Sequence, residues 1–145
     1  MRANRLALVA LAWLVAAAWL RATPPQAPAQ SVWNGVYTAE QAKRGEALYA
    51  QSCAACHGNA LEGGEMAPPL AGGAFNANWN GLTMGDLSER VRISMPQNNP
   101  GSLSRQQVSD ILAFMLSVGN FPAGKTELAR ETEVLKQIAF EATKK

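Results

Sequence analysis

The sequence predicts a small all-α domain of three or more helices joined by long loops. Two capping boxes, Thr38-Ala39-Glu40-Gln41 and Ser104-Arg105-Gln106-Gln107, each stand at the start of a helical stretch. Between these stretches lie a run rich in glycine, proline and asparagine, residues 58–81, and one short helix. No stretch of useful length shows the alternation of apolar and polar residues that marks a strand. Helices separated by loops are therefore expected.

The first 29 residues are expected to be an export signal rather than part of the domain. A basic start precedes an unbroken apolar stretch, Leu6 to Leu20, which is short for a membrane span. Ala27-Pro28-Ala29 then offers an Ala-x-Ala cleavage pattern, so the mature chain would begin at Gln30. Arg21 directly follows the apolar stretch, which leaves an uncleaved anchor in the inner membrane as the alternative.

Cleavage would change the charge of the chain. The full sequence has a formal charge of +2, but the mature chain would keep ten Lys and Arg residues against eleven Asp and Glu residues. No basic run remains, and basic residues do not alternate with aromatic ones. We therefore expect no nucleic-acid partner.

The first helix follows a short lead-in, residues 30–37. Thr38 would be its N-cap, with the Gln41 side chain reaching back, and the helix would continue through Tyr49 into residues 53–57. Gly45 within this helix costs about 1 kcal/mol relative to alanine. We expect another helix to approach closely there, because close packing would offset that cost.

Two further helices are predicted. A short one extends from Thr83 to about Ile93, and the last one follows Ser104 and is closed by Gly119. Apolar residues of the last helix recur with helical spacing: Val108, Ile111, Leu112, Met115 and Val118. Three helices give too little core for residues 38–120, and a buried cofactor would supply the missing apolar mass.

The segment Cys53-Ala54-Ala55-Cys56-His57 contains both cysteines and the single histidine of the chain. This spacing is typical of the attachment site of a c-type haem. One turn brings both sulfurs to the vinyl groups, where they form thioethers, and His57 follows as proximal axial ligand of the iron. A zinc site would need two more nitrogen or sulfur ligands, and no βαβ pattern supports a thioredoxin-like CxxC. One covalently bound haem c is predicted.

The second axial position cannot be a histidine, because the chain has only one. Methionine, another weak donor or a vacant position remains. Met95 lies in a loop with Pro96 and Pro100, which restrict the backbone, and we predict that it is the distal ligand. The other methionines are Met1 in the leader, Met66 soon after His57, Met84 at a helix start and Met115 on the apolar stripe.

The order of these features resembles the monohaem class I cytochromes c over about Thr38 to Asn120. That family has an all-α fold in which helices and long loops wrap one haem. The resemblance implies that the carbonyl of Pro68 accepts the Nδ1–H of His57, with Pro69 as the alternative. It also implies that Gly45 and Tyr49 of the first helix pack against the last helix, at Leu112 and Met115.

The residues around Trp79 and residues 95–101 and 112–114 are similar to those of small bacterial cytochromes that accept electrons from quinoprotein dehydrogenases. Trp79 would donate its indole N–H to a haem propionate or, equally well, to a backbone carbonyl. Residues 121–145 depart from the minimal family pattern and form a C-terminal extension. Leu128, Leu135, Ile138 and Ala142 could form an amphipathic helix packed on the domain or docked to a partner.

The predicted function is one-electron transfer. The protein is expected in the periplasm, because the resemblance implies that the haem is attached outside the cytoplasmic membrane. His/Met ligation leaves no open position for substrate, so the chain would be a carrier and not an enzyme. Electrons would pass from a periplasmic dehydrogenase, such as a quinoprotein, towards a terminal oxidase. The alternatives are a haem subunit of a dehydrogenase or oxidase complex and a gas- or peroxide-reactive haem protein. Membrane contact is expected only if the leader is uncleaved.

Overall fold

The structure is a computed structural model that describes residues 28–145, so the predicted leader lies outside them except for Pro28 and Ala29. The helices are α2 (Ala39–Ser52), α3 (Ala54–His57), α4 (Gly72–Trp79), α5 (Met84–Ser94), α6 (Arg105–Val118) and α7 (Thr132–Leu135), and a 3₁₀ turn, η2, spans Val32–Asn34. Two-residue strands, β1 (Gln30–Ser31) and β2 (Ile138–Ala139), pair in parallel. The predicted all-α class is confirmed. Within residues 28–145 no helix is long and apolar enough to cross a membrane.

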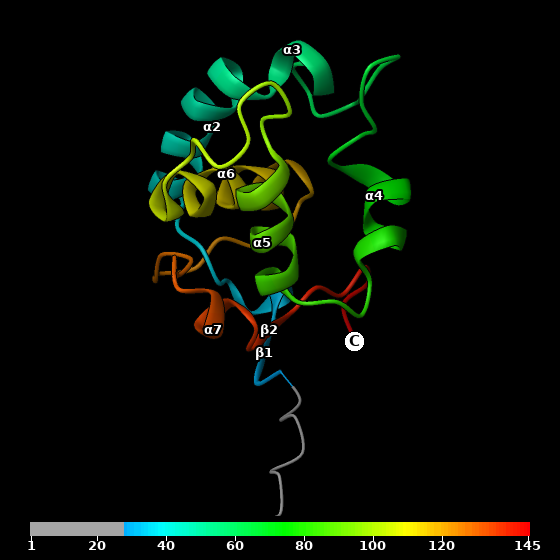
Figure 1. The fold of residues 1–145 in the computed structure, drawn as a ribbon. Coiled ribbons are helices and arrows are strands. Elements are labelled where there is room, and N and C mark those ends of the chain that lie inside the picture. The colour runs from blue at the N-terminus through cyan, green and yellow to red at the C-terminus, as the bar shows by residue number, and fades with distance from the viewer. Residues whose placement is uncertain (1–27) are drawn as a thin grey trace, which may run out of the picture.

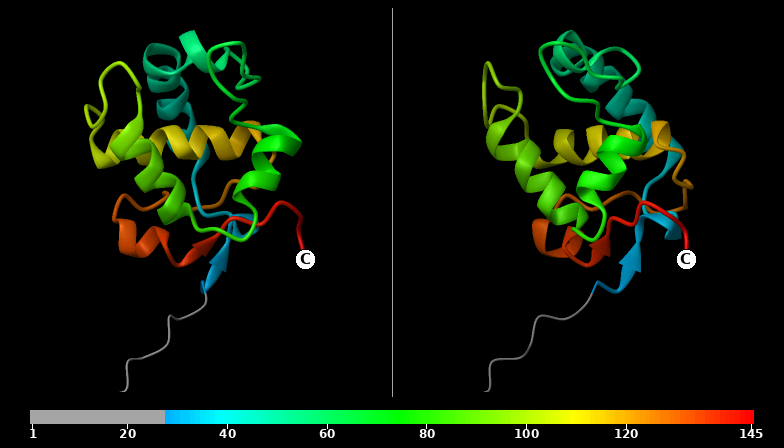
Figure 2. Two further views of the ribbon diagram at one scale, coloured as in Figure 1. Left: turned by 45° about the vertical axis from the view of Figure 1, so that its right-hand side comes forward. Right: turned by 90° about the vertical axis from the view of Figure 1, so that its right-hand side faces the viewer.

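Figure 1 shows α3 at one end of the molecule, and α7, the two strands and the C-terminus at the other. The loops 58–71 and 95–104 both extend to the α3 end, and the two turned views of Figure 2 show the same arrangement. Helices α2 and α6 form the central pair, and α5 and α4 lie beside them.

The crossing of α2 and α6 depends on Gly45, which is buried in α2. A Cβ atom at this position would overlap the backbone carbonyl of Asp110 and lie 3.0 Å from the backbone nitrogen of Ile111. The backbones therefore meet directly, and only glycine permits this approach. The predicted close approach of another helix at Gly45 is confirmed.

Capping explains why three of the helices begin where they do. Ser104 and Gln107 form the predicted reciprocal box at the start of α6, and Thr83 forms a further box with Asp86 at the start of α5. Thr38 caps α2 by accepting a hydrogen bond from the Gln41 backbone at 3.1 Å. The predicted return bond from the Gln41 side chain is wrong, because that side chain is buried in the core instead.

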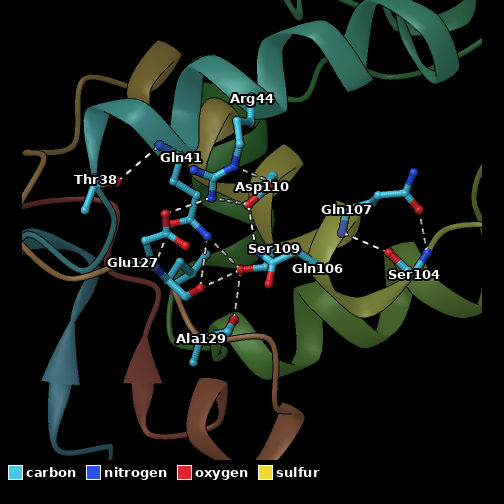
Figure 3. Close-up of polar contacts among 11 residues, drawn as sticks. Thr38, Gln41, Arg44, Ser104, Gln106, Gln107, Ser109, Asp110, Glu127 and Ala129 are labelled. Carbon is cyan, nitrogen blue, oxygen red and sulfur yellow. Dashed lines mark hydrogen bonds and ion pairs between the residues drawn. The ribbon is translucent and has the colours of Figure 1, made fainter.

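The buried amide of Gln41 holds the C-terminal segment against the helix pair (Figure 3). Its Nε2 donates to Ser109 Oγ at 3.1 Å and to the Leu128 carbonyl at 3.0 Å, and its Oε1 accepts from the Leu128 N–H at 2.6 Å. A buried amide must find such partners, since leaving it without them costs about 1–3 kcal/mol. These long-range bonds therefore replace the local one.

An ion-pair cluster lies beside this amide on the same crossing (Figure 3). The Arg44 guanidinium donates two hydrogen bonds of 3.1 Å to the buried carboxylate of Asp110 and also pairs with Glu127 at 2.8 Å. Gln106 Nε2 donates to the same Asp110 carboxylate at 2.9 Å. The cluster thus satisfies a buried carboxylate and attaches the C-terminal segment to α2 and α6.

Residues 121–145 share the core of the domain. The buried side chains of this segment are those of Phe121, Leu128, Leu135, Ile138 and Phe140. The helix considered for it does not form: only the single turn α7 is helical, and Ile138 and Ala139 form β2. The backbone of Phe140 accepts from Gly81 at 2.9 Å and donates to Leu82 at 2.8 Å. Pairing with the connection between α4 and α5 therefore holds this backbone extended.

Helix α4 lies in the glycine-rich run that the sequence predicted to be loop. Its start has no side-chain cap, and its one buried side chain is Phe75. The Phe75 ring meets the Phe140 ring edge-on, with centroids 5.8 Å apart. Packing against the C-terminal segment therefore stabilises a helix that local signals do not indicate.

Candidate functional site

The CAACH segment forms a tight turn at the end of α2. Cys53 ends α2 by donating its backbone N–H to the Tyr49 carbonyl at 2.9 Å. Its own carbonyl then accepts from the backbones of Cys56 at 3.1 Å and His57 at 3.0 Å. Both thiols are free; that of Cys53 is partly buried and that of Cys56 is exposed. One turn therefore brings together two reduced sulfurs and an imidazole.

The His57 ring is 7% exposed, and a backbone carbonyl holds it in place. His57 Nδ1 lies 2.8 Å from the Pro68 carbonyl oxygen. A carbonyl can only accept, so Nδ1 is the donor, and in a neutral ring Nε2 then has the lone pair that a metal would take. Of the two prolines considered, it is Pro68 rather than Pro69 that makes this hydrogen bond.

The loop 58–70 brings the Pro68 carbonyl to the histidine. The Gly63 N–H donates to the His57 carbonyl at 2.8 Å, and Leu70 donates to Leu61 at 2.9 Å. Gly63 has a φ of 75°, and a Cβ there would lie 2.5 Å from the Pro69 nitrogen. Glycine is thus required where the loop folds back over the histidine. Sequence reasoning missed this position, although its signal was the Gly63-Gly64 pair.

Tyr49 fixes the other side of the turn. Its hydroxyl donates to the Gly58 carbonyl at 2.7 Å, and its ring centroid lies 5.4 Å from that of Phe114 on α6. Burial, with smaller contributions from Cys53 and Glu62, raises the pKa of Tyr49 to about 12, so the hydroxyl remains a donor at neutral pH. The aromatic partner of Tyr49 on α6 is thus Phe114, and the packing expected against Leu112 and Met115 stays a prediction.

The thiol of Cys53 is not activated for redox exchange. Burial, and to a lesser degree the neighbouring Cys56, raises the pKa of Cys53 to about 11. Thiol–disulfide exchange needs a thiolate, and CxxC oxidoreductases lower this pKa instead. The burial of Cys53 therefore does not support a thioredoxin-like function of the motif.

The methionines differ in their surroundings. Met84 is fully buried and Met115 is 5% exposed, both within the core, whereas Met66 is 80% exposed. Met95 is partly buried and directly follows α5, where its backbone donates to the Val91 carbonyl at 2.9 Å. The loop that begins at Met95 extends to the α3 end of the molecule (Figures 1 and 2). This position is compatible with a ligand role, which stays a prediction.

Trp79 is the last residue of α4 and is partly buried. Its ring centroid lies 6.1 Å from that of Phe75, and its indole N–H takes part in none of the hydrogen bonds formed within residues 28–145. Asn76, one turn earlier, has a buried Oδ1 without a partner and lines a small cavity with Leu70 and Phe75. Nothing in the sequence singled out Asn76.

These residues fit a c-type haem. The attachment requires two reduced thiols one turn apart and an imidazole with its Nε2 free, and Cys53, Cys56 and His57 provide them. The unpartnered amide oxygen of Asn76 in an apolar cavity also marks a place where this chain alone leaves a polar group unsatisfied. Within residues 28–145, no group of three or more His, Cys, Asp or Glu side chains is placed to hold a metal ion by itself.

Comparison with known proteins gave two matches. The family model described as "Cytochrome C oxidase, cbb3-type, subunit III" matches residues 40–115. The crystal structure of the sulfane dehydrogenase SoxCD from Paracoccus pantotrophus aligns with a TM-score of 0.50 and 24% identity, over 83% of this chain and 66% of that chain. At this identity the second match shows a similar fold only. No curated protein matches the chain.

Proposed function

This chain belongs to the family described as cytochrome c oxidase, cbb3-type, subunit III, and from this premise we propose that it is a periplasmic one-electron carrier. The membership confirms the resemblance to monohaem c-type cytochromes and the class I cytochrome c fold. A cytochrome c domain implies a haem c and electron transfer. The periplasmic location, the single covalent haem and the partners are parts of the proposal.

Each site residue has a distinct proposed role. The sulfurs of Cys53 and Cys56 would hold the haem covalently, and His57 Nε2 and Met95 Sδ would ligate its iron. When bound, the haem supplies a one-electron couple. The Pro68 carbonyl, 2.8 Å from Nδ1, fixes the orientation of the imidazole and increases its basicity. Trp79 is proposed to donate its indole N–H to a propionate.

The single observation that carries the proposal is the His57–Pro68 hydrogen bond within a turn that also holds two free thiols. With this imidazole reserved for iron, the chain has no second histidine for acid–base or nucleophilic catalysis. We therefore propose a carrier rather than an enzyme. Its donor would be a periplasmic dehydrogenase, such as a quinoprotein, and its acceptor a terminal oxidase.

A haem subunit of a larger enzyme is the second candidate. The family description names an oxidase subunit, and the structural neighbour is a sulfane dehydrogenase. The two candidates differ in assembly. A carrier should elute from a size-exclusion column at the size of a single chain, whereas a subunit should co-purify with its enzyme at low salt. A gas- or peroxide-reactive haem protein is a third candidate, and the ligand test described in the Discussion separates it from the first two.

The haem should be attached covalently through Cys53 and Cys56. When the protein is produced in a host that matures c-type cytochromes, acid-acetone extraction should leave the pigment on the polypeptide. The intact mass should include one haem, and the double variant Cys53→Ala/Cys56→Ala should lose both properties, because no thioether can form. Extraction of the pigment from the wild-type protein, or its absence, would refute covalent attachment.

The mature chain should begin at Gln30. The start of the first described element supports this position, because β1 begins at Gln30 and pairs with β2. N-terminal sequencing and intact mass of the protein from a periplasmic extract measure the cleavage site. Recovery of the protein only in the membrane fraction, with Met1 retained, would favour the anchor instead.

A further inference from the structure

Charge is unevenly distributed between the two ends of the molecule. The motif end consists of α3 and the loops 58–71 and 95–104, which extend in the same direction in Figures 1 and 2. None of the ten Lys and Arg residues in 28–145 lies in these segments, whereas five of them lie in residues 121–145. The end that carries the two cysteines therefore has no lysine or arginine side chain.

Two carboxylates remain at the motif end, those of Glu62 and Glu65, and both residues are exposed. Glu62 accepts a hydrogen bond from the Ala60 backbone at 2.7 Å, which fixes its position. Neither carboxylate is among the ion pairs formed within residues 28–145, whereas Glu131, Glu133 and Glu141 of the C-terminal segment are all paired. The negative charge of the motif end is thus not neutralised by a neighbouring side chain.

The rest of the motif end is apolar or uncharged. Met66, at 80%, is the most exposed of the large apolar side chains of the described residues, and it is next to Glu65. Cys56 and Pro68 are also exposed. Three exposed amides, Gln97, Asn98 and Asn99, lie in the loop 95–104. A flexible methionine side chain at the surface can adapt to the shape of a protein that covers it.

We propose that the motif end is the docking face for a redox protein whose own surface has an apolar centre and a basic rim. This inference rests on the proposed function, since Cys56 would place the cofactor edge at this end. A basic rim complements Glu62 and Glu65, and the apolar centre covers Met66. A partner with an acidic docking surface meets two unpaired carboxylates and no lysine, so its approach is disfavoured.

Two small oxidants of opposite charge, tris(phenanthroline)cobalt(III) and ferricyanide, probe the local charge where electrons leave the reduced protein. Stopped-flow rates would be measured from about 10 mM to about 500 mM ionic strength, which shortens the screening length from about 30 Å to a few Å. For the wild-type protein, the rate with the cationic complex should fall as salt rises, and the rate with ferricyanide should rise. The opposite salt dependence would overturn the inference.

A matched pair of variants separates the motif end from the net charge. Glu65→Lys changes the charge at the motif end, and Glu133→Lys makes the same change on α7, where the Glu133 side chain is 83% exposed. At about 10 mM ionic strength, Glu65→Lys should lower the rate of oxidation by the cationic complex and raise the rate with ferricyanide, each by about three- to tenfold. Glu133→Lys should change either rate by less than about twofold. Haem content should be unchanged, and the reduction potential of each variant, measured on the same samples, corrects the rates for any change in driving force.

Equal rate changes in the two variants, or no change in Glu65→Lys, would show that electrons do not leave at the motif end. That result would overturn the docking face and leave the carrier proposal intact. A wild-type protein without covalent haem would instead refute the proposed function before either variant is compared.

Discussion

Replacing Met95 with alanine should abolish the weak charge-transfer band at the red end of the oxidised spectrum. The same variant should have a lower reduction potential and should bind carbon monoxide when reduced. A thioether is a soft, neutral ligand that favours ferrous iron, so its loss should shift the potential by a substantial part of the roughly 0.8 V range that axial ligands set. Absorption spectroscopy, redox titration and carbon monoxide binding measure the three effects.

Met95 is positioned by the end of a helix. Its N–H donates to the Val91 carbonyl at 2.9 Å, and Pro96 and Pro100 limit the conformations of the loop that follows. Little loop entropy should therefore be lost when its sulfur binds the iron. This constraint is the reason to expect a stable ligand rather than an exchangeable one.

Met66→Ala is the matched control for this experiment, because its side chain is 80% exposed and its removal should not disturb the core. The variant should keep the band. If Met66→Ala loses the band while Met95→Ala keeps it, the distal ligand is assigned incorrectly. If the wild-type protein lacks the band and binds carbon monoxide readily, the gas- or peroxide-reactive haem protein becomes the better description.

Replacing Gly45 with a larger residue should lower the free energy of unfolding. A Cβ at this position overlaps the Asp110 carbonyl, which is backbone and cannot rotate away. Gly45→Ala should therefore lower the free energy of unfolding by about 1–3 kcal/mol through overpacking, and Gly45→Leu should lower it further. Denaturant unfolding of the haem-loaded protein measures the difference. The strain is expected to reach the haem motif as well, because α2 ends directly at Cys53.

Ala47→Leu is the control, since Ala47 is exposed on the same helix and its replacement should change stability by no more than about 0.5 kcal/mol. In an exposed helical position, Gly→Ala stabilises by about 1 kcal/mol. The sign of the effect is therefore decisive: if Gly45→Ala raises the unfolding free energy, α6 does not approach α2 at this residue in solution.

The features that the sequence predicted correctly depend on residues close together in the chain. The box at Ser104 and Gln107 closes over three residues, and the apolar stripe of α6 repeats at the helical period. The CAACH chemistry also lies within five residues, so its spacing was enough to predict a c-type haem. Gly45 is an intermediate case: its cost within a helix indicated a close neighbour, and the tertiary structure showed which backbone it meets.

Other features were decided only by the tertiary structure, because they depend on partners far away in the sequence. Gln41 and Leu128 are 87 positions apart, and their hydrogen bonds replaced the local return bond of the first capping box. Contact between Phe75 and Phe140 stabilises α4 in a run of glycines, and pairing with Leu82 keeps the chain at Phe140 from forming a helix. Spacing within a few residues determines the haem motif and the helix starts. Buried polar groups and aromatic rings instead contact residues that come close only when the chain has folded.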